Sequence, residues 1–174
     1  MNPDHPNAEW SAVMFDILRD AGIGLFTHVP DHGNDFLIAL AMEHNDTRTL
    51  LLTSEEEGVA ICAGADLVGK RAILCMQSSG VGNCPNYLSL AKGANFPILM
   101  MITMRGDYGE QNPWQYPMGE AVDSILETMG VLNFKVERRD ELEKATLAAV
   151  DASGKGQKPA AIVLSQKFLG AKGF

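Results

Sequence analysis

The chain has 174 residues, 46% of them hydrophobic, and a formal net charge of -8 from 14 Lys plus Arg against 22 Asp plus Glu. This length and apolar content suit one compact domain that spans residues 1–174 and buries a core of its own. The acidic balance, without any basic run, argues against nucleic acid or an anionic membrane as a partner, and the longest apolar run, 96–103, is too short to span a bilayer.

Helix-like and strand-like segments alternate along the first half of the chain. Apolar residues at helical spacing predict a helix over 10–18 that ends before Gly22, and a second helix around 36–41. A third helix is expected from Ser54 onward. Apolar runs typical of strands separate these helices. The expected strands are 23–29, 48–53 and 71–77.

The second half continues the alternation after a glycine-rich stretch, SSGVGN at 78–83. A helix is expected over 83–93 and a strand over 96–103. A long polar loop, MRGDYGEQNPWQYPMGE at 104–120, then leads to a further helix. The last expected elements are a helix at 120–129, a strand at 133–137, a helix at 140–152 and a strand at 160–165.

Six strands that alternate with helices, several of them continuous apolar runs, indicate a parallel sheet covered on both faces. We therefore predict an α/β fold, a three-layer sandwich around a mostly parallel six-stranded sheet. In such sheets ligands bind beyond the carboxyl ends of the strands. The segments that should converge there are 29–35, 53–58, 77–83 and 104–111.

The three cysteines, Cys62, Cys75 and Cys84, show neither metal spacing nor paired spacing. An odd number of unpaired cysteines argues against a disulfide framework and favours a reducing compartment. The N-terminal stretch MNPDHPNAEW lacks the charged-then-apolar pattern of a signal peptide. We expect a cytoplasmic protein without a metal site of its own.

Three consecutive glutamates, Glu55 to Glu57, open the helix after the second strand. Ser54 and Glu57 have the spacing of a capping box, and acids in a first turn favour the helix dipole, so one interpretation leaves all three in solvent. The alternative is that one is buried, because the small residues that follow suggest close approach by another backbone or a ligand. A carboxyl in such a place has a raised pKa, which suits proton exchange with a ring nitrogen.

Three other segments carry candidate site residues at the same edge of the sheet. The turn QSSGVGN suits an anion or a polar ring, although it is neither a P-loop nor a dinucleotide fingerprint, and an ordinary loop is the alternative. Asp31 and His32 follow the first strand, where an acid–base role and a plain capping or surface role both remain open. Arg105 suits a substrate carboxylate, sulfonate or phosphonate. A salt bridge to Asp107 or Glu110 is the alternative.

The stretch TSEEEGVAICAGADLVGKRAILCMQSSGVGN, followed by an apolar strand, RG and PMG, resembles the pyrimidine-binding domain of thiamine diphosphate enzymes. The resemblance is closest to the sulfopyruvate and phosphonopyruvate decarboxylase group, and in particular to the separate alpha subunit of its two-chain members. It extends from VPD at Val29 to AAIVLS near the end of the chain. The Glu-x8-Gly spacing joined to MQSSGxGN is its most specific part.

In this family a glutamate lies nine residues before the Gly of an AG pair, which is Gly64 here. The resemblance therefore implies that Glu55 contacts N1′ of the aminopyrimidine ring, that Glu57 keeps the capping role and that Glu56 is solvated. It also implies that the turn after the third strand touches the cofactor. The cofactor-binding residues implied are Glu55, Gln77, Ser78, Ser79, Gly80 and Asn83.

Asp31 and His32 lie where related decarboxylases keep a proton-transfer Asp, so the resemblance makes both candidate catalytic residues beside Glu55. His32, Ser79 and Arg105 are the candidate substrate-binding residues. The phosphonopyruvate enzymes have VPDS where this chain has VPDH. His32 departs from that pattern and leaves the substrate open.

The activity implied is that of a lyase: the alpha subunit of a thiamine diphosphate-dependent 2-oxo acid decarboxylase that turns a sulfopyruvate- or phosphonopyruvate-like substrate into an aldehyde and CO2. A carboligase, a decarboxylase of another 2-oxo acid and a non-catalytic module are the alternatives. The Gly-Asp-Gly…Asn signature that holds Mg2+ and diphosphate in this family is absent from the sequence. We therefore expect a hetero-oligomer in which a beta subunit binds Mg2+ and diphosphate. The candidate residues for the interface between the two subunits are Trp114, Tyr116 and Met118 of the long loop.

Overall fold

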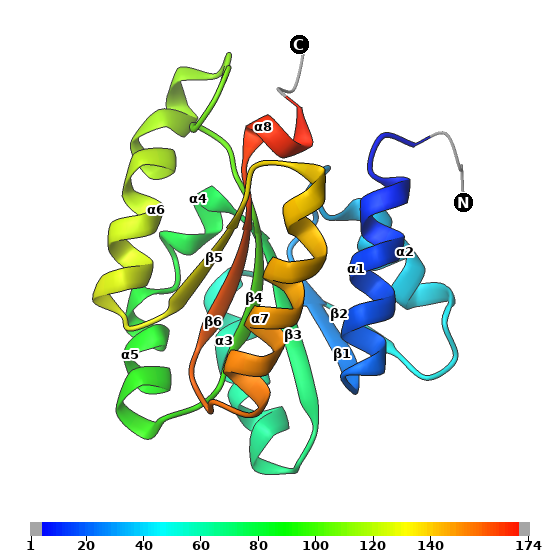
Figure 1. Cartoon of the computed structure of the whole chain (residues 1–174). Coiled ribbons are helices and arrows are strands. Elements are labelled where there is room, and N and C mark those ends of the chain that lie inside the picture. Colours follow the sequence, from blue (N-terminus) through cyan, green and yellow to red (C-terminus); the bar gives the residue numbers. More distant parts are fainter. Residues whose placement is uncertain (1–4, 171–174) are drawn as a thin grey trace.

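The structure is a computed structural model that describes residues 5–170, and Figure 1 shows its central sheet with helices packed on both faces. Six strands, all parallel, form the sheet in the order β2-β1-β3-β4-β6-β5. This arrangement confirms the predicted three-layer α/β sandwich. No helix in this part of the chain is long and apolar enough to cross a membrane.

Helices and strands alternate along the chain as the hydrophobic pattern predicted. The strands are β1 (Ile23–His28), β2 (Arg48–Leu51), β3 (Arg71–Gln77), β4 (Leu99–Thr103), β5 (Leu132–Val136) and β6 (Ala160–Leu164). The α-helices are α1 (Ala8–Asp20), α2 (Asp35–Glu43), α3 (Glu55–Leu67), α4 (Ser78–Val81), α5 (Pro85–Ala94), α6 (Tyr116–Thr128), α7 (Leu142–Gly154) and α8 (Gln166–Leu169). Two short 3-10 helices are η1 (Pro113–Gln115) and η2 (Arg139–Glu141).

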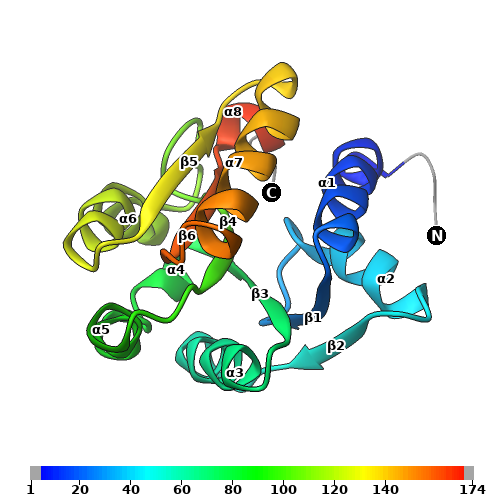
Figure 2. The same cartoon turned by 60° about the horizontal axis from the view of Figure 1, so that its bottom comes forward.

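The sheet separates two hydrophobic cores, because each strand directs alternate side chains to opposite faces. Ile73 and Cys75 of β3 face the core under α1, α2 and α7, whereas Leu74 and Met76 face the core under α3, α5 and α6. All four side chains are fully buried, and burial of one such side chain contributes about 2 kcal/mol. Figure 2 shows the two groups of helices on either side of the sheet.

The loops after β1 and β3 leave the sheet in opposite directions. The chain after β1 enters α2 on one face, and the chain after β3 enters α4 and α5 on the other. Because β1 and β3 are neighbours in the sheet, their loops part at its carboxyl edge. Such a switch point is the usual ligand position of an open parallel sheet. The polar segments 29–35 and 77–83 meet there.

Three elements differ from the sequence-based expectation. Helix α6 begins at Tyr116 rather than at Glu120, because Pro117 occupies the first turn of a helix without loss of a hydrogen bond. Tyr116 and Met118 therefore lie on a helix and not in the long loop. The glycine-rich stretch 78–83 contains α4, and α8 follows β6. Both of these helices span a single turn, which is too short for periodicity to reveal.

The three cysteines are free and buried in the two cores, which confirms that no disulfide joins them. Burial raises the pKa of the Cys62 and Cys84 thiols to about 12. Nucleophilic and metal-binding cysteines react as thiolates. These cysteines are therefore packing residues.

Candidate active site at the carboxyl edge of the sheet

Glu55 is the buried member of the three glutamates. It is the first residue of α3 and is 8% exposed, whereas Glu56 is half-buried and Glu57 is exposed. Its Oε2 accepts a hydrogen bond of 2.8 Å from Nδ2 of Asn83. Its Oε1 accepts no hydrogen bond from residues 5–170. The carboxylate is thus fixed by one oxygen and keeps the other available.

The backbone of Gly80 lies directly against the Glu55 side chain. A Cβ atom at position 80 would stand 2.4 Å from Oε1 of Glu55, well inside contact distance. Only glycine allows this approach. Gly80 belongs to α4 and Asn83 follows it, so one short turn both packs against the carboxylate and donates a hydrogen bond to it.

The predicted capping box at the start of α3 is wrong. The hydroxyl of Ser54 donates to the Glu56 carboxylate and gives the helix no side-chain cap. Glu57 accepts a hydrogen bond of 2.9 Å from the backbone N–H of Thr53, one residue before the N-cap. The bond from Ser54 also lowers the pKa of Glu56. Glu56 and Glu57 therefore hold the loop before α3 through these hydrogen bonds.

The small residues of α3 serve, at one position, to bring the helix close to the sheet. A Cβ atom at Gly58 would lie 2.4 Å from Cδ1 of Leu74 and 2.8 Å from Cδ1 of Leu52. Gly64, on the same helix, has nothing within 4 Å. The close approach expected from this composition is thus made with β3 at Gly58, while open space remains at Gly64.

Asp31 connects the carboxyl ends of three strands. Its Oδ1 accepts a hydrogen bond of 2.8 Å from Nε2 of Gln77. Its Oδ2 accepts hydrogen bonds from Oγ1 of Thr103, at 2.6 Å, and from the backbone N–H of Gly33, at 3.1 Å. An ionised carboxylate can only accept hydrogen bonds, so Gln77 must donate to Asp31 through its amide nitrogen. Gln77 therefore turns its Oε1 away and accepts a bond of 2.9 Å from Ser79.

Ser78 faces the protein interior, unlike its neighbour Ser79. Its hydroxyl donates to the carbonyl oxygen of Arg105 at 3.1 Å and accepts from the N–H of the same residue at 2.9 Å. This pair of bonds ties the end of β3 to the end of β4. Ser79 and Asn83 are exposed, and Ser78 is fully buried. The structure therefore brings Ser79 and Asn83 to the edge, and Ser78 lies behind them.

Arg105 forms a salt bridge with Glu110, which is the alternative that the sequence left open. Its Nε and Nη2 donate to the two carboxylate oxygens, each at 2.6 Å. The Glu110 side chain is 1% exposed, and it also accepts from Gln166 and from backbone N–H groups of its own loop. The Arg105 guanidinium, with these further donors, holds the pKa of Glu110 far below its ordinary value.

A cavity of about 390 Å³ lies beside Asp31. Its polar lining includes Asp31, His32, Thr103, Arg105 and Gln166. The structure thus brings three residues singled out in the sequence to one cavity, together with Thr103 and Gln166, which sequence analysis missed. A polar residue at the end of an apolar strand was the available signal for Thr103. Gln166 carried no comparable signal.

Glu55 does not line this cavity, and helix α4 lies between Glu55 and the residues that do. Gly80 of α4 touches Glu55, while Ser79 binds Gln77, which in turn binds Asp31. The cofactor candidates and the substrate candidates therefore lie next to one another along the edge, on the two sides of α4. Ser78 lies behind this edge, and Arg105 lines the cavity while two of its N–H groups bind Glu110.

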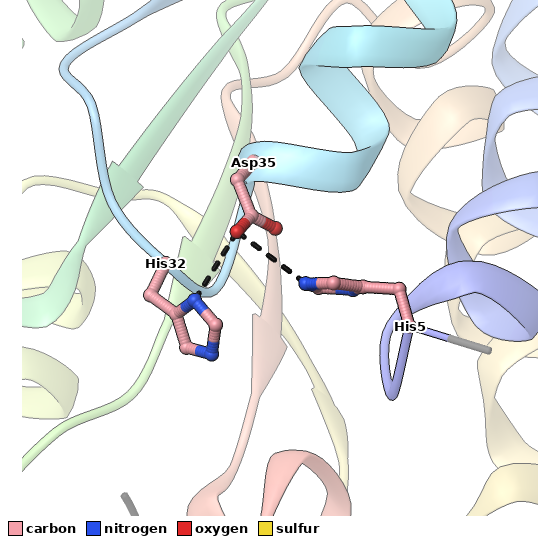
Figure 3. A group of neighbouring side chains, drawn as sticks. All are labelled: His5, His32 and Asp35. Atoms are coloured by element: carbon pink, nitrogen blue, oxygen red, sulfur yellow. Dashed lines mark ion pairs between the residues drawn. The ribbon is translucent and has the colours of Figure 1, made fainter. Parts of the chain in front are cut away.

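One group of side chains within residues 5–170 has a geometry open to a metal ion. His5, His32 and Asp35 bring two imidazole nitrogens and a carboxylate oxygen within 4.8 Å of one another (Figure 3). The sequence predicted no metal site, and His5 and Asp35 were not among its candidates. His5 and Asp35 are 30 positions apart along the chain, so spacing gave no signal.

The comparison with curated proteins identifies relatives along nearly the whole chain, although no family model matches. The chain is 34% identical to the sulfopyruvate decarboxylase subunit alpha of Methanococcus maripaludis, over 88% of this chain and 93% of that one. It is 32% identical to a sulfopyruvate decarboxylase of Methanosarcina acetivorans, over 80% of this chain and 36% of that one. It is also 32% identical to a phosphonopyruvate decarboxylase of Streptomyces viridochromogenes, over 86% of this chain and 38% of that one.

Among solved structures, the fold matches a 2-oxoglutarate:ferredoxin oxidoreductase from Magnetococcus marinus. The TM-score is 0.68, and the match covers 92% of this chain and 29% of that chain at 13% identity. This likeness supports the fold alone. The relative from Methanococcus maripaludis, in contrast, matches in both sequence and length. The chain therefore belongs to the family of sulfopyruvate decarboxylase alpha subunits.

Proposed function

We propose that this chain is the alpha subunit of a thiamine diphosphate-dependent decarboxylase, which converts a 2-oxo acid with a second acidic group into an aldehyde and CO2. Family membership supports the reaction class, since the relatives are named sulfopyruvate and phosphonopyruvate decarboxylases. The observation that carries the proposal is Glu55, buried at the switch-point edge with one oxygen held and the other available.

The residues around Glu55 fit the aminopyrimidine ring of this cofactor. A ring nitrogen that must be held protonated needs a fixed carboxylate, and Asn83 and Gly80 fix this one. Thiamine diphosphate, when bound, supplies an acceptor for the electron pair left by the departing CO2. In our proposal Glu55 holds the proton at the ring nitrogen, while Gln77, Ser79 and the α4 turn bind the adjacent polar edge.

We assign the substrate to the cavity beside Asp31. Arg105 keeps N–H donors beyond the two that bind Glu110. Because Glu110 balances its charge, Arg105 serves the acidic tail of the substrate as a hydrogen-bond donor rather than as a net positive charge. His32 lines the same cavity. Ser79 is connected to it by its hydrogen bond to Gln77, which in turn binds Asp31 of the cavity lining.

The partner in this proposal is a beta subunit that binds the diphosphate and Mg2+. Two observations support a second chain. The relative from Methanococcus maripaludis is named as a subunit. The relative from Methanosarcina acetivorans is a longer chain, of which this chain matches 36%. The missing Gly-Asp-Gly…Asn signature indicates which half the partner supplies.

The test compares Glu55→Gln with Glu57→Gln in the enzyme purified with its partner subunit. CO2 release from sulfopyruvate, phosphonopyruvate and pyruvate is measured with thiamine diphosphate and Mg2+ present and absent. We expect Glu55→Gln to lower kcat by about 10²-fold or more. Glu57→Gln keeps its activity, because Glu57 is exposed and binds only its own loop. Near-normal turnover by Glu55→Gln would contradict the proposal, and a hydroxyketone product in place of the aldehyde would assign a carboligase.

A further inference from the structure

The side chains of His5, His32 and Asp35 converge on one another (Figure 3), and His32 also lines the proposed substrate cavity. His5 precedes α1, His32 lies in the loop after β1, and Asp35 opens α2. Oδ2 of Asp35 lies 3.1 Å from Nδ1 of His32 and 3.6 Å from Nε2 of His5. One carboxylate oxygen therefore faces two imidazole rings.

The segment before α1 is anchored on the His32 loop. The His5 ring stacks on Phe36 with the centroids 5.4 Å apart. Asn7, which is 5% exposed, donates through Nδ2 to the carbonyl oxygen of His32 at 3.0 Å. Oδ1 of the same Asn7 accepts a bond of 3.1 Å from the indole N–H of Trp10. The His5 ring and the backbone of His32 are thus held in place by contacts around them.

The hydrogen bonds of His5 favour a proton rather than a metal ion between these side chains. A histidine that binds a metal through one ring nitrogen carries its proton on the other, where it donates. Nδ1 of His5 instead accepts a bond of 3.2 Å from the backbone N–H of Asn7. Neutral His5 therefore carries its proton on Nε2, directed at Asp35.

Asp31, the other candidate for proton transfer, is committed as an acceptor. Its oxygens receive three hydrogen bonds, from Gln77, Thr103 and Gly33. Protonation of Asp31 would break one of these bonds and loosen the junction between β1, β3 and β4. His32, in contrast, has a side chain that is 55% exposed and lines the cavity. Only its Nδ1 faces Asp35, which leaves Nε2 available.

We propose that His32 donates the proton that replaces the carboxylate of the substrate, and that Asp35 and His5 are its positioning residues. This inference rests on the proposed function. The reaction is R–CO–COO⁻ + H⁺ → R–CHO + CO2: the C–C bond breaks, and a C–H bond forms with one proton. The Nε2 of protonated His32 supplies that proton and recovers one from water. Asp35 keeps the remaining proton on Nδ1 and fixes the tautomer, as in other carboxylate–histidine pairs.

The charged and titratable groups that contact His32 or line a cavity with it come from several elements. They are His5 before α1, Asp35 at the start of α2, His28 at the end of β1, Asp31 in the same loop and Arg105 after β4. Asp35 is the anion in direct contact with the ring. Loss of the Asp35 charge therefore removes the anion that stabilises the protonated His32 ring.

The experiment uses the two-chain enzyme with its cofactors and compares His32→Gln, Asp35→Asn and the control His44→Gln. His44 lies at the opposite end of α2. We expect His32→Gln to lower kcat about 100-fold and to lower KM by a similar factor, because the proton is transferred after CO2 has left and kcat/KM reports only the steps up to that departure. In a rapid-quench measurement it still releases one CO2 per site in the first turnover, because the C–C bond breaks before the proton is needed. Asp35→Asn moves the alkaline limb of the kcat–pH profile to lower pH.

Each outcome separates this inference from the proposed function. No CO2 from the unmodified complex with any 2-oxo acid would overturn the proposed function itself. Full turnover by His32→Gln, or loss of its first-turnover CO2, overturns only the proton assignment. An unmoved pH profile in Asp35→Asn removes the positioning role. One zinc ion per chain in equilibrium dialysis, lost in His5→Gln and in Asp35→Asn, would assign the cluster to a metal instead.

Discussion

Glu55 differs from Glu56 and Glu57 in its surroundings, since all three have the same chemistry. Gly80 and Asn83 come from the turn after β3, 28 positions from Glu55 in the case of Asn83. They surround the first glutamate only. Its neighbours bind Ser54 and the backbone of Thr53. The close approach of Gly80 and the hydrogen bond from Asn83 therefore distinguish Glu55 from the two glutamates that follow it.

Gly80→Ala is expected to displace Glu55, because the new Cβ atom would stand 2.4 Å from Oε1. CO2 release by the complex should fall by about 10²-fold, as for loss of the acid itself, and overpacking should cost about 1–3 kcal/mol in urea unfolding. Gly93→Ala is the matched control. It adds a Cβ atom in open space on α5 and should stabilise the chain by about 0.5–1 kcal/mol. Full activity in Gly80→Ala would show that the position of the Glu55 carboxylate does not depend on a glycine at residue 80.

At the scale of elements, the segment between β4 and α6 depends on one buried carboxylate. Glu110 binds Arg105, Gln166 and three backbone N–H groups, so it joins this loop to the end of β4 and to α8. Tyr116 adds a bond of 2.6 Å from its hydroxyl to the carbonyl oxygen of Glu110. These hydrogen bonds fix the conformation of the loop, which begins beside the cavity at Arg105.

Glu110→Gln should destabilise the chain by about 3 kcal/mol at pH 7, because it leaves the guanidinium of Arg105, whose side chain is only 14% exposed, without its carboxylate partner. The pKa of Glu110 is lowered on folding. Its contribution is therefore complete above the unfolded pKa of about 4 and is lost as the pH falls below it. Urea unfolding between pH 7 and pH 3 should show a weaker acid dependence in the variant than in the parent.

Glu137→Gln is the control for that experiment. Glu137 pairs with Lys167 on the surface, where both side chains are almost half exposed. Such a pair contributes about 0–1 kcal/mol. An equal loss of stability in the two variants would mean that the contacts of Glu110 do not hold the loop.

At the scale of the whole molecule, two cores cover both faces of the sheet, and the carboxyl edge is left for a ligand and a partner. The three interface candidates differ in how they are placed. Tyr116 is bound to Glu110, and Met118 lies over Gly82. Trp114 is 88% exposed. Of the three, Trp114 has the largest surface available to a second chain.

Trp114→Ala should weaken the complex with the partner subunit by about 30-fold, as expected for a tryptophan at the centre of an interface. The stability of the chain alone should change by less than about 0.5 kcal/mol, because the side chain is exposed. Leu147→Ala on α7, which packs on the opposite face of the sheet, is the control. Sedimentation of the mixed subunits measures both variants. Unchanged affinity in Trp114→Ala would place the interface elsewhere.

The sequence by itself determined the elements and the family of this protein. Apolar periodicity acts over a few residues, so it predicted all six strands and most helices, and it failed only where a helix spans one turn or where Pro117 starts α6 early. The resemblance identified Glu55 because a motif keeps its spacing along the chain. It also named the family to which the relatives assign the chain.

Only the tertiary structure decided which side chains meet. Asp31 binds Gln77 and Thr103, which lie 46 and 72 positions away, and no local pattern records such pairs. The choice of Glu110 over Asp107 as the partner of Arg105 depends on the path of the loop. The meeting of His5 with Asp35 requires the segment before α1 to pack on the loop after β1. Strand order and loop path bring these groups together, and both result from burying two cores at once rather than from any short stretch of sequence.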